Sequence, residues 1–386
     1  MISVLPTPFG SVTIPRFFAP TALAAARDCR LRLVLQSTPG GSSALPPGPA
    51  AALGALSHRY SSLFATSVEP ATLVFDRAHR EIVAHLAEDQ ATVQYADLPR
   101  VLGATAWSRF RFALIDRTRD HVRARRWARG TRPQRDTPTV FGTERTLLNT
   151  ALRLKGRADL IHRLPDGTIE IRDFKTGEIF DASGEIDAGI QIQLRCYGLL
   201  MLELFPGSKV RLLIDDGTEY EVPFALCDQR KLRRRLGKLY RELPQGARIP
   251  ASKLASPGDA CHHCPVRHRC TAYLEMAPKW WQATAKLPFP IPRDTWGGIV
   301  NSEVGIGGAF GVTLRDAAGR DIRVDRLDPA RWPIQPAKGA RLWAFNLEST
   351  ISAGRARSVG LHPSVFYECP ADSTQQRAWA LQLFTN

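Results

Sequence analysis

The residues with the clearest chemical potential lie between Gly156 and Gly177, in the segment GRADLIHRLPDGTIEIRDFKTG. Runs of alternating apolar residues flank Pro165–Gly167, a turn sequence, and together they predict a β-hairpin. In the register that this loop imposes, Asp159 faces Asp173, and Lys175 points to the same side of the sheet. Opposed carboxylates repel each other unless a cation lies between them or one is protonated. The pattern therefore indicates metal-assisted phosphodiester hydrolysis, the alternative being a hairpin whose charged groups are all solvated.

Further polar residues occur on elements that would have to position this hairpin. A helix is predicted from about Glu185 to Phe205, and Gln193 and Tyr197 interrupt its apolar stripe. Polar groups on a buried helix face need partners, which a nearby active site would supply, although Tyr197 could equally be an amphipathic core residue. Glu144 lies on the strand-like segment that leads into the hairpin and is a further acidic candidate.

Cysteines are concentrated in the sequence CHHCPVRHRC, where Cys261, Cys264 and Cys270 follow a C-x2-C-x5-C spacing. Three thiols in one short segment indicate a metal site. One alternative is zinc with His262, His263 or His268 as fourth ligand, and the other is an iron–sulfur cluster whose fourth thiolate comes from elsewhere. Cys29, at the end of a predicted helix, is the best candidate for that thiolate. The scattered residues Cys196, Cys227 and Cys369 are expected to be buried as small apolar side chains.

Size and charge restrict the class of protein. A chain of 386 residues is long enough for two domains, and seven cysteines in that length are no disulfide framework of a small secreted protein. The net charge of +15 favours a polyanionic partner, most simply nucleic acid. The sequence shows neither a transmembrane-length apolar run nor a signal peptide, so we expect a cytoplasmic protein without membrane contact.

The predicted elements divide the chain into two domains. Residues 1–285 form the first, with a mostly helical insert at about 51–135, a catalytic core at about 138–225 and the cysteine cluster at 261–270. Residues 290–386 contain short strands and Gly-rich turns, which predict a small all-β domain of the OB-barrel type. Its aromatic residues could hold a single strand, or the domain could instead dock a protein. These aromatic residues are Trp332, Trp343 and Phe345.

A basic stretch closes the helical insert and could follow a nucleic-acid backbone, with nearby indoles for stacking, or could simply be a solvated helix face with its tryptophans in the core. The residues concerned are Trp107, Arg117, Arg119, Arg123, Arg125, Arg126, Trp127, Arg129, Arg132 and Arg135.

Taken together and in order, these motifs resemble the RecB-like nucleases of the PD-(D/E)xK superfamily. The likeness is greatest to the iron–sulfur branch, which includes AddB-type recombination nucleases and CRISPR-associated exonucleases. The resemblance covers roughly residues 15–275. One departure is that Ala158 stands where the superfamily name has proline. The matching positions are Cys29, His58, Gly156–Asp159, Asp173–Lys175, Gln193–Tyr197 and the Cys261, Cys264 and Cys270 group.

The resemblance implies a mixed α/β (α+β) fold with a restriction-endonuclease-like core, and it implies roles for these residues. His58, Asp159, Asp173 and the carbonyl group of Phe174 would hold Mg²⁺ or Mn²⁺. Lys175 would position or activate the attacking water. Gln193 and Tyr197 would support that lysine or contact DNA. The cysteines Cys29, Cys261, Cys264 and Cys270 would bind a structural [4Fe–4S] cluster.

The expected activity is that of a metal-dependent deoxyribonuclease, acting as an exonuclease on single-stranded DNA or DNA ends in repair, recombination or antiviral defence. The resemblance implies a helicase or a defence-complex subunit as a partner, since relatives often work with one. The chain itself lacks the G-x-x-x-x-G-K-[S/T] motif of an ATPase, so we do not expect it to be a helicase. The alternative is a catalytically idle nucleic-acid-binding subunit of a helicase–nuclease or CRISPR-type complex. A third possibility is an interaction module stabilised by zinc.

Overall fold

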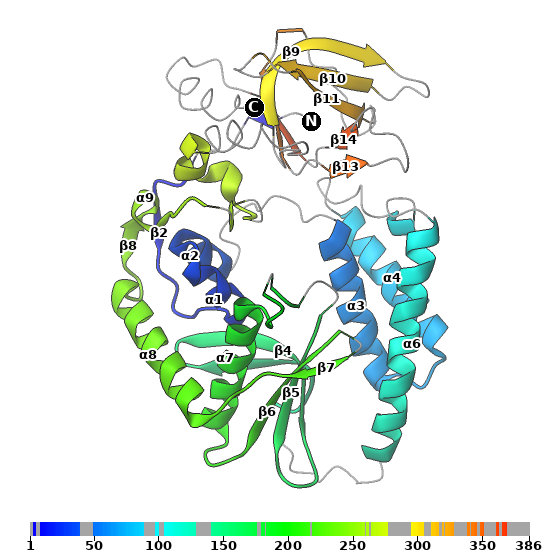
Figure 1. The fold of residues 1–386 in the computed structure, drawn as a ribbon, viewed down its shortest axis with the longest axis vertical. Helices are drawn as coiled ribbons and strands as arrows, with labels where there is room; N and C mark the ends of the chain where they lie inside the picture. Colours follow the sequence, from blue (N-terminus) through cyan, green and yellow to red (C-terminus); the bar gives the residue numbers. More distant parts are fainter. Residues whose placement is uncertain are drawn as a thin grey trace. The chain divides into compact units, whose positions relative to one another are not determined.

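The structure is a computed structural model, and its chain divides into two compact units, which are described separately below (Figure 1). The first comprises Thr13–Gly41 and Pro49–Arg248, and the second Met1–Val12, Ser42–Gly48 and Ile249–Asn386. The residues that the structure describes are 3–4, 8–38, 49–88, 97–99, 104–128, 140–175, 179–181, 183–216, 218–258, 260–261, 264–276, 295–304, 310–315, 319, 321–327, 338–339, 341–345, 348–350, 360–362 and 365–368.

A mixed five-stranded sheet lies at the centre of the first unit, in the order β3-β4-β5-β6-β7. Only β5 and β6 run parallel, while the other neighbouring strands are antiparallel. A parallel pair needs a crossover, and here the crossover is helix α7. The bounds are β3 Gly142–Asn149, β4 Leu154–Arg163, β5 Ile169–Phe174, α7 Ala188–Leu204, β6 Val210–Asp215 and β7 Glu219–Glu221.

The predicted hairpin is formed by β4 and β5. Its ladder runs from Arg163 opposite Ile169 to Leu160 opposite Arg172, which places Asp159 and Asp173 one step beyond in the predicted register. Gly167 in the turn has φ +83°, a left-handed conformation that glycine adopts at little cost. The turn is also held by Asp166, whose carboxylate accepts hydrogen bonds from the backbone N–H (2.9 Å) and hydroxyl (3.0 Å) of Thr168.

Helix α7 packs against the sheet, and glycine allows its closest approaches. A Cβ atom on Gly156 of β4 would lie 2.6 Å from Pro20 and 3.0 Å from Tyr197. The helix begins at Asp187, whose side chain accepts hydrogen bonds from the N–H groups of Gly189 and Ile190. Three elements from both ends of this unit pack against it: α1 Pro20–Leu23, the 3₁₀ helix η1 Ala24–Arg27 and α8 Leu226–Glu242. Helix α2, Arg30–Ser37, packs on α1 and η1.

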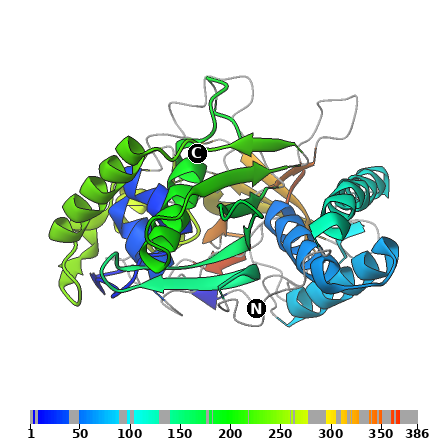
Figure 2. The same ribbon diagram turned by 90° about the horizontal axis from the view of Figure 1, so that it is seen from below.

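Three further helices share a separate apolar cluster and lie together at the edge of the sheet away from α8 (Figures 1 and 2). They are α3 Pro49–Thr66, α4 Ala71–Ala87 and α6 Ala104–Ala128. Trp107 packs in this cluster, where its ring centroid lies 5.7 Å from Phe75 and 4.8 Å from His79. The core alternative is therefore correct for Trp107. In the basic stretch after Trp107, neither the arginine side chains nor Trp127 fall among the described side chains.

This unit confirms a mixed α/β fold with a helical N-terminal part. Among the described residues, no helix is long and apolar enough to cross a bilayer.

The described residues of the second unit are rich in β-structure. Eight strands form one sheet in the order β1-β15-β12-β9-β10-β11-β14-β13. The OB-type barrel and the boundary at 285–290 stay predictions. Trp332 and the side chains of Trp343 and Phe345 lie outside the described part. The strands are β1 Ser3–Val4, β9 Thr295–Val304, β10 Phe310–Arg315, β11 Asp321–Leu327, β12 Arg341–Phe345, β13 Glu348–Thr350, β14 Gly360–His362 and β15 Val365–Glu368.

Short elements complete the chain. Strand β2, Ser11–Thr13, pairs with β8, Arg248–Pro250, in a two-stranded sheet. Helix α9, Ala251–Leu254, and the 3₁₀ helix η4, Arg267–Arg269, lie in the segment that carries the cysteine motif.

Candidate active site

Asp173 and Lys175 lie at the end of β5 and point to the same side, as their spacing predicts. The Asp173 side chain is buried, and its Oδ2 lies 2.7 Å from Lys175 Nζ. The backbone N–H of Lys175 donates to the carbonyl oxygen of Asp215 at 2.9 Å, which continues the β5–β6 pairing one residue beyond the strand. The parallel neighbour therefore fixes the direction in which the lysine leaves the sheet.

Gln193 of α7 joins the two charged groups. Its Nε2 donates to Asp173 Oδ1 at 2.7 Å, and its Oε1 accepts from Lys175 Nζ at 3.3 Å. The amide thus uses both of its ends to hold a carboxylate and an ammonium group in one geometry. Tyr197, one turn further along the helix, donates its hydroxyl hydrogen to the carbonyl oxygen of Arg157 at 2.7 Å. This hydrogen bond links α7 to the backbone of β4.

The site continues across β4 to Asp159 and His58. Asp159 Oδ2 accepts from the backbone N–H of Phe174 at 2.8 Å, which ties the two hairpin arms together. Asp159 Oδ1 lies 3.5 Å from Nδ1 of His58, a residue of α3. His58 therefore reaches the hairpin from the helical region, although about one hundred residues separate the two along the chain.

Glu144 of β3 joins this group, as the sequence suggested only weakly. His58, Glu144 and Asp159 each offer a ligand atom, and these atoms lie within 4.8 Å of one another. Glu144 has φ +54°, a left-handed conformation that is uncommon for residues other than glycine. The β3–β4 ladder pairs Arg145 with Ala158 and Thr143 with Leu160 but omits the position between them. The ladder is thus interrupted where Glu144 and Asp159 would otherwise face each other.

The ionisable groups of the site influence one another. Burial raises the pKa of Asp173 to about 6, against the opposing effect of Lys175. Burial likewise raises the pKa of Glu144, although Arg157 Nε lies 2.6 Å from its Oε2. The hydrogen bond to Asp159 raises the pKa of His58. Three carboxylates are opposed by Lys175 and Arg157, so with a neutral His58 one negative charge is left for a cation to neutralise.

The donor set suits a divalent cation. Carboxylate oxygens are preferred by Mg²⁺, and Mn²⁺ also accepts an imidazole nitrogen. The described geometry groups His58, Glu144 and Asp159 as candidate ligands, whereas Asp173 contacts Lys175 and Gln193. Asp159 links the candidate ligands to the Asp173 group, because its negative charge also raises the pKa of Asp173.

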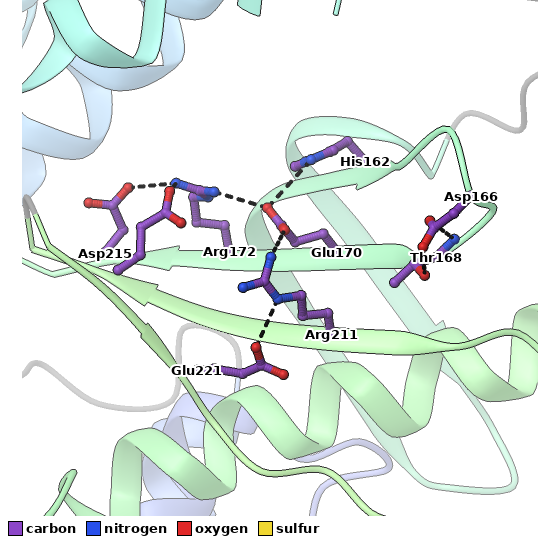
Figure 3. Close-up of polar contacts among 9 residues, drawn as sticks. His162, Asp166, Thr168, Glu170, Arg172, Arg211, Asp215 and Glu221 are labelled. Atoms are coloured by element: carbon purple, nitrogen blue, oxygen red, sulfur yellow. Dashed lines mark hydrogen bonds and ion pairs between the residues drawn. The ribbon is translucent and has the colours of Figure 1, made fainter. Parts of the chain in front are cut away.

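A second charged network lies on the opposite face of the sheet (Figure 3), and we did not predict it. The buried carboxylate of Glu170 has His162 at 3.4 Å, Arg172 at 3.0 Å and Arg211 at 3.3 Å. Arg172 also contacts the fully buried Asp215 at 3.0 Å. The signal was present in the sequence IEIRD, where Glu170 and Arg172 alternate with the residues of the face that carries Asp173.

The cysteine motif and Cys29 belong to different units of the chain. Cys261 and Cys264 are buried and Cys270 is half-buried, all within the second unit. Cys264 N–H donates to the carbonyl oxygen of Cys261 at 3.0 Å in a tight turn. Cys29 precedes α2 in the first unit, so a four-cysteine site stays a prediction. His262 and His263 lie outside the described residues.

The remaining cysteines test the expectation of burial. Cys196 is fully buried, and burial raises its pKa to about 12, so the prediction is confirmed there. For Cys227 the prediction was wrong: it is exposed, because it lies in the first turn of α8, away from that helix's apolar stripe. Cys369 lies outside the described residues.

The family to which the chain belongs agrees with this site. The profile of the PD-(D/E)XK nuclease superfamily matches residues 18–271, more than half of the chain, and the chain belongs to that superfamily. Its members cleave phosphodiesters, so the class of protein is a nuclease that acts on nucleic acid. No curated protein matches the chain. Among solved structures, the crystal structure of SSO0001 matches with 23% identity and a TM-score of 0.23, covering 50% of this chain and 85% of that one.

The raised pKa of Asp173 predicts a pH dependence of stability. With an ordinary value near 3.8 and a folded value near 6, the folded state binds the proton more tightly, so the metal-free protein should lose stability as the pH rises from about 4 to 6. We expect Asp173→Asn to remove that loss, as measured by urea unfolding in a chelator between pH 4.5 and 6.5. Asp166→Asn is the control, because the pKa of Asp166 is lowered and titrates below this window. Equal slopes for the wild type and Asp173→Asn would contradict the assignment.

Proposed function

We propose that the chain is a metal-dependent deoxyribonuclease of the RecB-like, iron–sulfur branch of its superfamily. The observation that carries the proposal is the hydrogen-bonded set of Asp173, Gln193 and Lys175 beside the candidate ligands His58 and Asp159. Such an arrangement combines a cation site with a positioned ammonium group, which is the requirement for phosphodiester hydrolysis. The net charge of +15 supports a polyanionic substrate.

Each residue has a part in the proposed reaction. When bound, a divalent cation supplies Lewis acidity toward the phosphate and favours ionisation of water. Lys175 places its ammonium hydrogens toward the water and the phosphate oxygens, where they stabilise the negative charge that develops in the transition state. Gln193 holds that ammonium group in place because its amide oxygen accepts a hydrogen bond from Nζ, and Tyr197 fixes α7 to β4.

The lysine is the sharpest test of the activity. Lys175→Ala removes the group that stabilises developing charge, and we expect cleavage to fall by about 10²–10³-fold or more while DNA binding is kept. Labelled linear single-stranded, linear double-stranded and circular DNA, each with Mn²⁺ or a chelator, would report the rate and whether free ends are required.

Lys155→Ala is the matched control, because Lys155 is an exposed lysine on the neighbouring strand β4. A Lys175→Ala variant that cleaves as fast as the wild type would refute the proposed activity.

We further propose Glu144 as a cation ligand, in addition to the set that the superfamily resemblance implies. Its carboxylate lies in one cluster with the ligand atoms of His58 and Asp159, and its backbone is turned into a left-handed conformation there. Asp173 and the carbonyl group of Phe174 complete the proposed ligand set from β5.

Metal affinity tests Glu144 separately from catalysis. We expect Glu144→Gln to weaken Mn²⁺ binding about tenfold or more, because an amide is a poorer ligand than a carboxylate for this hard cation. Titration calorimetry, or the loss of the free Mn²⁺ signal in electron paramagnetic resonance, would measure the change. Glu221→Gln, on β7 and paired with Arg211 instead, should leave the affinity unchanged. Wild-type affinity in the Glu144 variant would exclude the residue from the ligand set.

The cysteines support the iron–sulfur part of the proposal. Cys261, Cys264 and Cys270 would be ligands, with Cys29 as the fourth, and the cluster would stabilise the fold more than take part in hydrolysis. Zinc bound to the same thiolates is the alternative.

Absorbance decides between the two metals. Protein purified without oxygen should be brown, with a broad charge-transfer band at roughly 400 nm that is typical of thiolate-bound iron. We expect Cys29→Ser to lose that band, whereas Cys227→Ser, an exposed cysteine outside the motif, keeps it. Colourless wild-type protein with stoichiometric zinc would overturn the iron–sulfur assignment.

A further inference from the structure

A second candidate binding site lies among the helices that pack beside α7. A cavity of about 270 Å³ is lined by residues of α1, η1, α2, α7 and α8, all within the first unit. None of its lining residues belongs to the candidate active site. The proposed hydrolysis therefore leaves the cavity without a role.

The floor of the cavity is apolar. It is made by side chains that are at most 8% exposed and that come from α1, α7 and α8. These side chains are Leu23, Ile192, Leu232, Leu236 and Leu239. A floor of this kind accommodates a flat, weakly polar group such as a nucleobase but offers nothing to a fully hydrated ion.

The rim of the cavity is cationic. Arg27, Arg235 and Lys238 lie at its border, and Arg30 is half-buried there. Among the described lining residues, Glu242 is the one acidic group, and it pairs with Arg30 across the cavity from α8 to α2. The rim therefore carries several positive charges that Glu242 does not neutralise, around a hollow in which an anion would be partly desolvated.

We propose that this cavity binds one nucleotide of single-stranded nucleic acid, with the base on the leucine floor and the flanking phosphates on the arginine and lysine rim. The choice of nucleic acid rests on the proposed function. Guanidinium groups pair with phosphate in a forked geometry, and an unpaired base has an apolar face to bury. A duplex would present stacked and paired bases, which fit the floor poorly. An acidic peptide would match the rim but leave the floor uncovered.

The cavity and the candidate active site share one helix. Ile192 lines the cavity, and the next residue, Gln193, holds Asp173 and Lys175. Successive helical side chains point about 100° apart, so Ile192 and Gln193 face different surroundings. A nucleotide seated in the cavity is therefore distinct from the one that is cleaved, and the cavity anchors a part of the strand away from the scissile bond.

Paired charge removals on α8 test the site. Arg235→Ala with Lys238→Ala removes two rim cations, whereas Lys231→Ala with Arg234→Ala removes two exposed cations of the same helix, at the same spacing, that do not line the cavity. Binding of a fluorescein-labelled oligo(dT) of about 20 nucleotides is measured by anisotropy in EDTA, over a range of salt concentrations. For the first pair we expect the affinity for oligo(dT) to fall about tenfold, and the slope of log affinity against log salt concentration to be smaller in magnitude by about 1.4. For the second pair we expect the affinity to fall less than about twofold.

A third variant tests the floor without changing charge. Ala26→Leu, on η1, fills part of the cavity, and we expect it to weaken oligo(dT) binding several-fold. Circular dichroism checks that each variant is folded. Equal losses for the two charge pairs would overturn the proposal in favour of diffuse electrostatic attraction, and unchanged binding by Ala26→Leu would overturn the seating of a base.

Competition identifies the occupant. In one arm, dTMP is added at the same total nucleotide concentration as the oligonucleotide. If dTMP displaces the oligonucleotide, the proposal is overturned in favour of a free nucleotide. Stronger binding of poly-glutamate than of oligo(dT), with the same dependence on Arg235 and Lys238, would overturn it in favour of an acidic protein segment. None of these binding measurements depends on cleavage of the nucleic acid. A wild-type protein that fails to cleave DNA but shows the expected contrast would reject the proposed function and leave the strand site standing.

Discussion

The structure of the site depends on one buried carboxylate, that of Asp173. Removing an ionised carboxylate from water costs several kcal/mol unless partners replace the lost hydration. Lys175 and Gln193 supply those partners, one from the strand that carries Asp173 and the other from α7. Since Gln193 reaches Asp173 only when α7 is seated on the sheet, the packing of this helix and the chemistry of the strand end depend on each other.

The packing of α7 against the sheet constrains residues elsewhere in the chain. Its contacts with the sheet leave no room for a Cβ atom at Gly156, and Tyr197 fixes the helix to the backbone of β4 at Arg157. Two residues beyond Arg157 on the same strand is Asp159, which in turn holds the N–H of Phe174. A continuous path of packed and hydrogen-bonded groups therefore runs from the helix, through β4, back to the strand that bears Asp173.

The sequence was informative where local rules decide the structure. The turn chemistry at Gly167 and the two-residue period of strands predicted the hairpin, its register and the common side of Asp173 and Lys175. Glu144 was only loosely predicted, because its approach to Asp159 depends on a positive φ that no residue pattern specifies for glutamate. The network around Glu170 was missed for another reason: charged residues on an apolar strand reveal their partners only once β6 is known to lie alongside.

That network explains how β5 can carry ionisable groups on both faces. Isolated charges on a central strand would destabilise it, but Arg172 contacts both Glu170 and Asp215, so each of these buried carboxylates has a cationic partner. Asp215 also accepts the backbone N–H of Lys175, so one residue of β6 serves the reverse face by its side chain and the catalytic end of β5 by its carbonyl group. The pairing with β6 thereby sets the position of the strand end that bears Asp173, beside the candidate ligand Asp159.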